Sequence, residues 1–240
     1  LSTEIGKAVS KETKIDILVT PLVTIGSGML FSAILAPIIG KAAIQVGSII
    51  MWATELQPFF MGILVSALVG IALTLPISSA AICAALGLTG LAGGAAVAGC
   101  CAQMVGFAVI SFRENGVSGL ISQGLGTSML QMGNIVKNPK IWIPATFASM
   151  ITGPLATCVF HFENNGPAGM GTCGLVGPIG VYTGWLKAIE EGTKTAVTAF
   201  DWLSLLLLCF ILPAILSLLC ATLCRKMGWI KEGDMKFSLS

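Results

Sequence analysis

The chain has 240 residues, of which 55% are hydrophobic and 10% are charged, and its mean hydropathy is +0.92. Because a soluble domain carries about 25% charged residues, this composition excludes a soluble globular fold. The net charge is +2 and no basic run is interleaved with aromatic residues, so no nucleic acid partner is expected. The composition therefore predicts an all-α protein that crosses a membrane several times.

The segments without charged residues mark the predicted spans. A membrane-spanning helix needs about 20 mostly apolar residues, and the segment 41–54 is too short to cross and is expected at the interface. We predict about six transmembrane helices plus two re-entrant or discontinuous segments, within one polytopic domain over 1–240. The charge-free segments are 17–40, 56–112, 115–136, 141–162, 164–186 and 202–224.

The long segment 56–112 has room for more than one helix. Pro58 suits the first position of a helix, where its missing N–H is not needed. Pro76 marks a break, and Ser78 can cap a second helix behind it. Gly90 and Gly94 form a small-xxx-small pair that lets helices approach closely. We expect these glycines to form a junction before a further long helix.

The segments 115–136 and 164–186 differ from ordinary spans because both are rich in glycine and polar residues. Such irregular backbone cannot face lipid, where an unpaired N–H or C=O costs several kcal/mol. Both are therefore predicted as discontinuous elements of the kind that form substrate sites in transporters, and the alternative is a pair of surface loops. The glycine and proline residues expected to shape the second are Gly174, Gly177 and Pro178.

A polar set in the first discontinuous segment is a candidate solute site. Its amides and hydroxyls can bind sugar hydroxyls without burying a net charge. Spacings of four, four and three residues would place four of them on one helical face; the alternative is hydrogen bonding between helices that stabilises the bundle. The set is Gln123, Thr127, Ser128, Gln131 and Asn134.

A second candidate group follows the predicted span 141–162. His161 and Glu163 are ionisable, and Asn165 comes directly after them. An ionisable pair near membrane depth indicates a functional site, although an interfacial loop facing water is an equal alternative. We predict that these three residues take part in solute binding.

The sequence offers little support for catalytic, redox or metal chemistry. The eight cysteines form no C-x-x-C pair, and the single histidine has no partner at metal-ligand spacing. Buried apolar cysteine is the main interpretation, and redox or metal chemistry is the alternative. We therefore expect no catalytic residue, no metal and no cofactor.

Three ordered motifs carry a resemblance to a known family. They are Pro76-Ile77-Ser78-Ser79-Ala80-Ala81-Ile82, then Asn134-Ile135-Val136-Lys137-Asn138-Pro139 with Pro144, and then the block Gly166–Gly180. In this order they resemble the EIIC-like integral membrane proteins of the bacterial phosphotransferase system, in the branch of sugar transporter subunit IIC or EIIC-like regulator. The resemblance is strongest over 57–182, and because members are longer upstream, it implies that an N-terminal part is missing.

The resemblance implies a component that binds and translocates a sugar-like solute. IIC sites use carboxylate and histidine to hold sugar hydroxyls, and phosphorylation belongs to a separate IIB partner, so the chain itself is not expected to be an enzyme. A homodimer and a cytoplasmic IIA, IIB or regulatory partner are also expected. The alternative is a membrane-embedded ligand sensor without transport.

Basic residues follow the last predicted span. By the positive-inside rule they place the C-terminus in the cytoplasm, and the resemblance places the protein in the bacterial cytoplasmic membrane. These residues are Arg225, Lys226, Lys231 and Lys236.

Overall fold

The structure is a computed structural model that describes residues 23, 25, 26, 28, 29, 41, 45 and 48–237. The chain divides into two units, Leu1–Val46 and Gly47–Ser240, and the fold below is that of the second. Throughout the described residues the regular elements are helices, without a β-strand. The all-α prediction is therefore confirmed there, whereas the predicted span 17–40 lies almost wholly outside the described residues.

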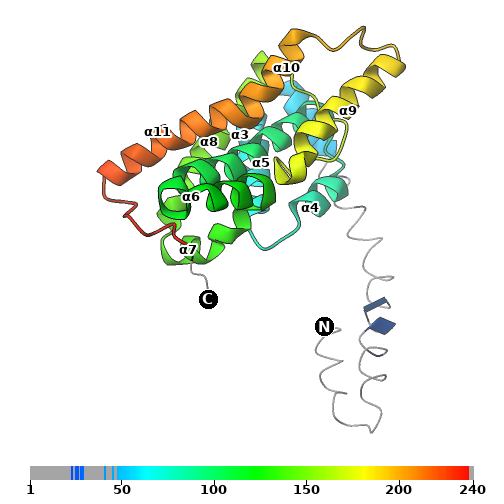
Figure 1. Ribbon diagram of the computed structural model, residues 1–240. Helices are drawn as coiled ribbons and strands as arrows, with labels where there is room; N and C mark the ends of the chain where they lie inside the picture. Colours follow the sequence, from blue (N-terminus) through cyan, green and yellow to red (C-terminus); the bar gives the residue numbers. More distant parts are fainter. Residues whose placement is uncertain are drawn as a thin grey trace. The chain divides into compact units, whose positions relative to one another are not determined.

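The second unit begins with helical residues 48–56 and continues through nine α-helices (Figure 1). They are α3 (Pro58–Thr74), α4 (Ser79–Leu86), α5 (Gly90–Ile110), α6 (Phe112–Ile121), α7 (Met132–Lys137), α8 (Ile143–Pro154), α9 (Val176–Glu190), α10 (Ala199–Leu206) and α11 (Leu212–Lys226). Short 3-10 or π-helical turns join them: η1 (Ser122–Gly126), η2 (Ser128–Gln131), η3 (Pro139–Trp142), η4 (Leu155–Val159), η5 (Cys173–Leu175) and η6 (Leu207–Ile211).

Helix α5 is the centre of the unit and packs against α3, α8 and α11. Most of its side chains are buried, and many are glycine or alanine. A Cβ atom on Gly99 would collide with the main chain of Ser66 in α3. Small residues on α5 therefore let the neighbouring backbones approach closely, as packing within a membrane requires.

Among the described residues, three helical stretches are long and apolar enough to cross a membrane: Gly90–Ile110, Pro139–Val159 and Ala199–Lys226. Helix α3 is also apolar but shorter. These stretches support a protein with several spans, and the count of about six remains a prediction.

The start of α5 differs from the prediction. Gly90 is left-handed, with φ +59°, as a junction requires, but Gly93 and Gly94 lie within α5. These two glycines lie against the main chain of residues 162–164, where no Cβ would fit. The other two breaks are confirmed. Pro58 is at the start of α3, and the Ser78 side chain accepts a hydrogen bond of 3.2 Å from the Ala81 N–H as the cap of α4.

The first discontinuous segment is broken, as predicted, but it does not contain one helical face. The chain passes from α6 through η1 into an extended residue, Thr127, with φ −157° and ψ 140°, and then through η2 into α7. The predicted alignment of Gln123 with Gln131 and Asn134 on one helix is therefore wrong. Glycines at 124 and 126, with Thr127, interrupt the helical repeat that the alignment needs.

Candidate functional site

A cavity of about 240 Å³ lies at the end of the unit formed by α9, α10 and the chain that follows η4. Its walls combine three aromatic rings with five ionisable or amide side chains. The residues that line it are Phe160, His161, Phe162, Glu163, Asn165, Gly184, Trp185, Ala188, Thr193, Lys194, Asp201 and Ser204. The structure thus brings together His161, Glu163 and Asn165, the second group of predicted site residues.

The glycines of α5 fix the chain that carries this group. The Asn165 side-chain oxygen accepts a hydrogen bond of 3.0 Å from the Gly90 N–H, and the Asn164 N–H donates one of 3.0 Å to the Gly90 carbonyl. Gly94 lies against the Phe162 carbonyl so closely that any side chain would collide with it. The wall of the cavity is therefore attached to the start of the central helix.

His161 and Glu163 are both exposed, and within the described part of the chain neither side chain makes a hydrogen bond or ion pair. His161 also adopts the left-handed conformation, with φ 43°. A non-glycine residue in this region is uncommon and is frequently functional. The two ionisable groups are thus available to a solute in the cavity.

No sequence pattern predicts the opposite wall of the cavity. Lys194 forms an ion pair of 2.7 Å with Asp201, and its ammonium lies 5.0 Å from the centre of the Trp185 ring. Thr198 and Asp201 form a capping box at the start of α10. The sequence signal for this box is the threonine three residues before the aspartate, and it predicts a helix start rather than a binding wall.

Aromatic rings from three segments gather behind this wall. Phe162 and Trp185 meet edge to face with their centres 6.5 Å apart, and Trp185 meets Trp202 at 6.2 Å. Tyr182 packs on Trp202 at 5.4 Å. Four aromatic residues from separate parts of the sequence therefore pack together beside the cavity, which their positions in the sequence do not indicate.

The first group of predicted site residues lies elsewhere, and its polar atoms mostly bond within the protein. Gln123 is buried and donates to the Ser111 hydroxyl at 2.7 Å, although its own carbonyl oxygen has no partner among the described residues. The buried Ser128 hydroxyl is 3.0 Å from the Thr74 hydroxyl of α3. Thr127 lines a separate cavity of about 140 Å³ beside α4.

Gln131 and Asn134 hold the C-terminal segment. The Gln131 amide donates to the Met235 carbonyl at 3.0 Å, and the Asn134 amide donates to the Lys236 carbonyl at 3.1 Å. The two amides also bond each other at 2.8 Å. Their polar capacity is thus used by the chain itself, which favours the interpretation of this group as structural.

The glycine and proline junctions of the second discontinuous segment are as irregular as predicted. Gly174 is left-handed with φ +52°, and the Gly177 N–H donates to the Gly171 carbonyl at 2.8 Å. Gly177 and Pro178 are buried at the start of α9. Pro76 lies in the turn between α3 and α4. The irregular backbone is covered by protein at Gly177 and Pro178 but is exposed at Gly174 and Pro76, so the expectation of complete cover holds only in part.

Comparisons with known proteins agree with the resemblance inferred from the motifs. Neither the curated proteins nor the solved structures gave a match. The family described as "Phosphotransferase system, EIIC" matches residues 1–237, nearly the whole chain. Together with the apolar helices, this match identifies a membrane component of the phosphotransferase transport system. The chain belongs to the phosphotransferase system EIIC family.

Proposed function

We propose that the chain binds a sugar-like solute in the cavity between residues 160–165, α9 and α10 and carries it across the membrane. The observation that carries the proposal is the pair of unbonded ionisable side chains, His161 and Glu163, in a cavity lined by aromatic rings. Elsewhere, the amides of Gln131 and Asn134 already have partners within the chain.

The chemistry of the walls suits a small polyhydroxylated molecule. A carboxylate accepts hydrogen bonds from hydroxyl groups, and an imidazole can donate or accept them. Sites for drug-sized ligands are typically about 300–1,000 Å³, so a cavity of about 240 Å³ fits a solute of monosaccharide size. Phosphorylation would remain the task of a separate cytoplasmic partner, and a homodimer stays part of the proposal.

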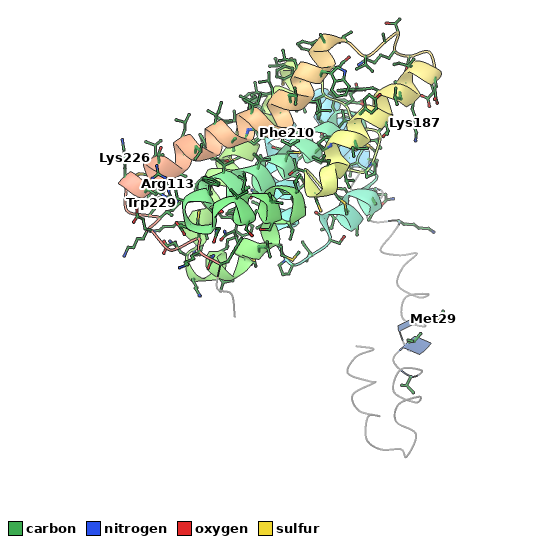
Figure 2. All side chains as sticks on the ribbon, viewed as in Figure 1. Met29, Arg113, Lys187, Phe210, Lys226 and Trp229 are labelled. Carbon is green, nitrogen blue, oxygen red and sulfur yellow. The ribbon has the colours of Figure 1, made fainter. Side chains whose placement is uncertain are left out.

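The cavity and the C-terminal segment lie at opposite ends of one long helical stretch. The stretch Ala199–Lys226 has 28 residues, which corresponds to about 42 Å at 1.5 Å per residue. Figure 2 places Lys187 at the cavity end and Lys226 and Trp229 at the other. Because basic residues concentrate around Lys226, the positive-inside rule favours a cytoplasmic tail and a cavity that opens on the far side.

Binding and uptake by the purified, reconstituted protein test this proposal. A panel of sugars and polyols is titrated calorimetrically, and the best ligand is followed into liposomes. Loss of a hydrogen bond to a charged group costs about 1.5–3 kcal/mol, so Glu163→Gln is expected to weaken binding about tenfold or more. The matched control is Glu191→Gln, an exposed carboxylate outside the cavity.

Three outcomes are informative. Binding and uptake that both fall in Glu163→Gln, but not in the control, support the proposal. Binding without uptake would favour the sensor alternative. If no sugar-like compound binds the parent protein, the solute-carrier proposal fails.

A further inference from the structure

The C-terminal tail, residues 229–237, is docked across α6 and α7. The Met235 N–H donates to the Glu114 carboxylate at 2.8 Å. The Met235 carbonyl accepts bonds from the amides of Asn115 at 2.8 Å and Gln131 at 3.0 Å. One tail residue is therefore held through its main chain by side chains from both sides of the discontinuous segment.

The neighbouring tail residues are bound in the same way. The Phe237 N–H donates to Asn115 at 2.9 Å, and the Lys236 carbonyl accepts from Asn134 at 3.1 Å. At the start of the tail, the Asn138 amide donates to the Trp229 carbonyl at 3.0 Å. The docking site thus binds the tail mainly through its peptide main chain.

Side-chain anchors are few. Met235 is 0% exposed and packs in a cluster with Phe107, Ile110 and Ile135, and Ile230 belongs to the same cluster at 2% exposure. Residues 231–233 between them are exposed. The bonds of Asn134 and Asn138 to the tail main chain also lie at the surface, where water can replace them. A segment with such an exposed middle part and exposed bonds belongs to the less stable parts of a structure.

The docked tail contacts the chain on both sides of the break at residues 122–131. Asn115 is in α6 and Asn134 is in α7, and both contact the tail. Gln131 shares the turn η2 with Ser128, which bonds Thr74 of the central bundle. A tail that leaves would therefore remove the hydrogen bonds through which it links α6 to α7, while the packing of α6 and of η2 on α5 would remain.

We propose that the tail is a releasable latch, seated in a peptide-binding groove of α6 and α7, that closes this end of the molecule. The occupant is the chain's own segment 229–237, anchored by Met235. Release lets α6 and α7 separate about the break at Thr127. The claim that this motion opens the solute route rests on the proposed function, whereas the docking itself does not.

Hydrogen exchange of the full-length protein tests the latch. Met235→Asp places a charge in the apolar anchor site and is expected to raise exchange over 112–137 at least tenfold, with α5 and α8 unchanged. Met227→Asp is the matched control, because Met227 is 54% exposed and lies just before the tail. Unchanged exchange over 112–137, or equal exchange increases in α5 and α8, would overturn the proposal.

A separately added peptide tests whether Met235→Asp empties a peptide-binding groove or only destabilises the whole protein. A synthetic peptide with the sequence of residues 229–237 is added to the Met235→Asp protein. Restored protection over 112–137, absent with a peptide carrying the same Met235→Asp change, is expected. Failure of the unaltered peptide to bind would overturn the peptide-groove assignment.

Uptake separates this inference from the proposed function. A released latch is expected to change the uptake rate of the Met235→Asp protein several-fold while solute affinity stays the same. If exchange rises but uptake does not change, the tail docks without closing a route. If the parent transports nothing, the proposed function fails while the exchange and peptide results still decide the docking.

Discussion

The two regions that hold the predicted site residues, 112–137 and 161–175, have similar compositions, but their polar groups have different partners. In the first, the amides of Gln131 and Asn134 bond the C-terminal tail. In the second, Asn165 bonds the start of α5 while His161 and Glu163 face a cavity without a partner in the described chain. Both are glycine-rich and polar, and the second brings two ionisable side chains that lack a bond in the described chain to a cavity.

The difference lies in burial and in the partners of each polar group. A buried donor or acceptor is usually bonded, because an unmet bond costs about 1–3 kcal/mol. Gln131 is completely buried and bonded, whereas Glu163 is exposed and unbonded. Polar composition therefore indicates an irregular element, and the location of the partners decides its role.

The largest loss of stability is expected for a substitution at Gly94 of α5, which packs against the second region. In Gly94→Ala the new Cβ would overlap the Phe162 carbonyl, and backbone on both sides leaves no room to yield. Overpacking of this kind costs about 3 kcal/mol or more, so the cavity wall should lose its position and the melting temperature should fall sharply. Fluorescence-detected size exclusion after heating measures this loss.

The control for Gly94 is Gly133→Ala in α7, where no atom lies within 4 Å of the new Cβ. Since alanine favours helix over glycine, the control should be neutral or slightly more stable. Equal stability of the two variants would contradict the close packing of α5 on residues 162–164.

The next effect concerns Gln131. Gln131→Ala leaves the Met235 carbonyl with one donor fewer and removes the acceptor of the Asn134 amide. A loss of about 1–3 kcal/mol in unfolding free energy is expected, with solute affinity unchanged. Urea unfolding and a binding titration measure the two quantities. If solute affinity falls while the free energy of unfolding does not change, Gln131 belongs to the solute site instead.

Ser128→Ala is expected to cost about 1 kcal/mol, the value of one interhelical hydrogen bond. The Ser128 hydroxyl bonds Thr74, which also reaches Gln103 at 3.5 Å, and Gln103 donates to Thr146 at 3.1 Å. A double-mutant cycle with Thr74→Val measures the coupling. Additive effects of the two changes would show that this bond contributes nothing.

The smallest stability effect is expected at His161. Its left-handed φ of 43° suits glycine, so His161→Gly should change stability by less than about 1 kcal/mol, in the stabilising direction. Solute affinity should fall because the imidazole is removed. Thermal melting and the same titration test both parts, and a destabilised variant with full affinity would remove His161 from the site.

Much of the architecture could be predicted from residues alone. Pro58 and Ser78 mark helix starts by local chemistry, since one lacks an N–H and the other supplies a cap acceptor. The start of α5 could not be predicted in this way. Gly93 and Gly94 look like helix breakers in sequence, yet both lie within α5, and the close packing of residues 162–164 leaves no room for a larger residue at either position.

The candidate site likewise has one part that a local sequence pattern can predict and one part that it cannot. The residues from 161 to 165 are neighbours in sequence, so a local pattern could identify them. The same cavity is also lined by Trp185 of α9, Asp201 of α10 and Lys194 of the connection between these helices. No local pattern links these three residues to residue 161. The assignment of Gln131 to the tail likewise joins residues 104 positions apart.

The sequence by itself determined the class of the protein, the helix starts marked by Pro58 and Ser78, and its family, because hydropathy, proline, capping residues and ordered motifs act over short distances. Only the tertiary structure decided which polar groups bond each other and which remain open to a solute. The physical reason is that a hydrogen bond depends on distance in space, and the chain brings Met235 to Asn115 while it leaves Glu163 facing a cavity.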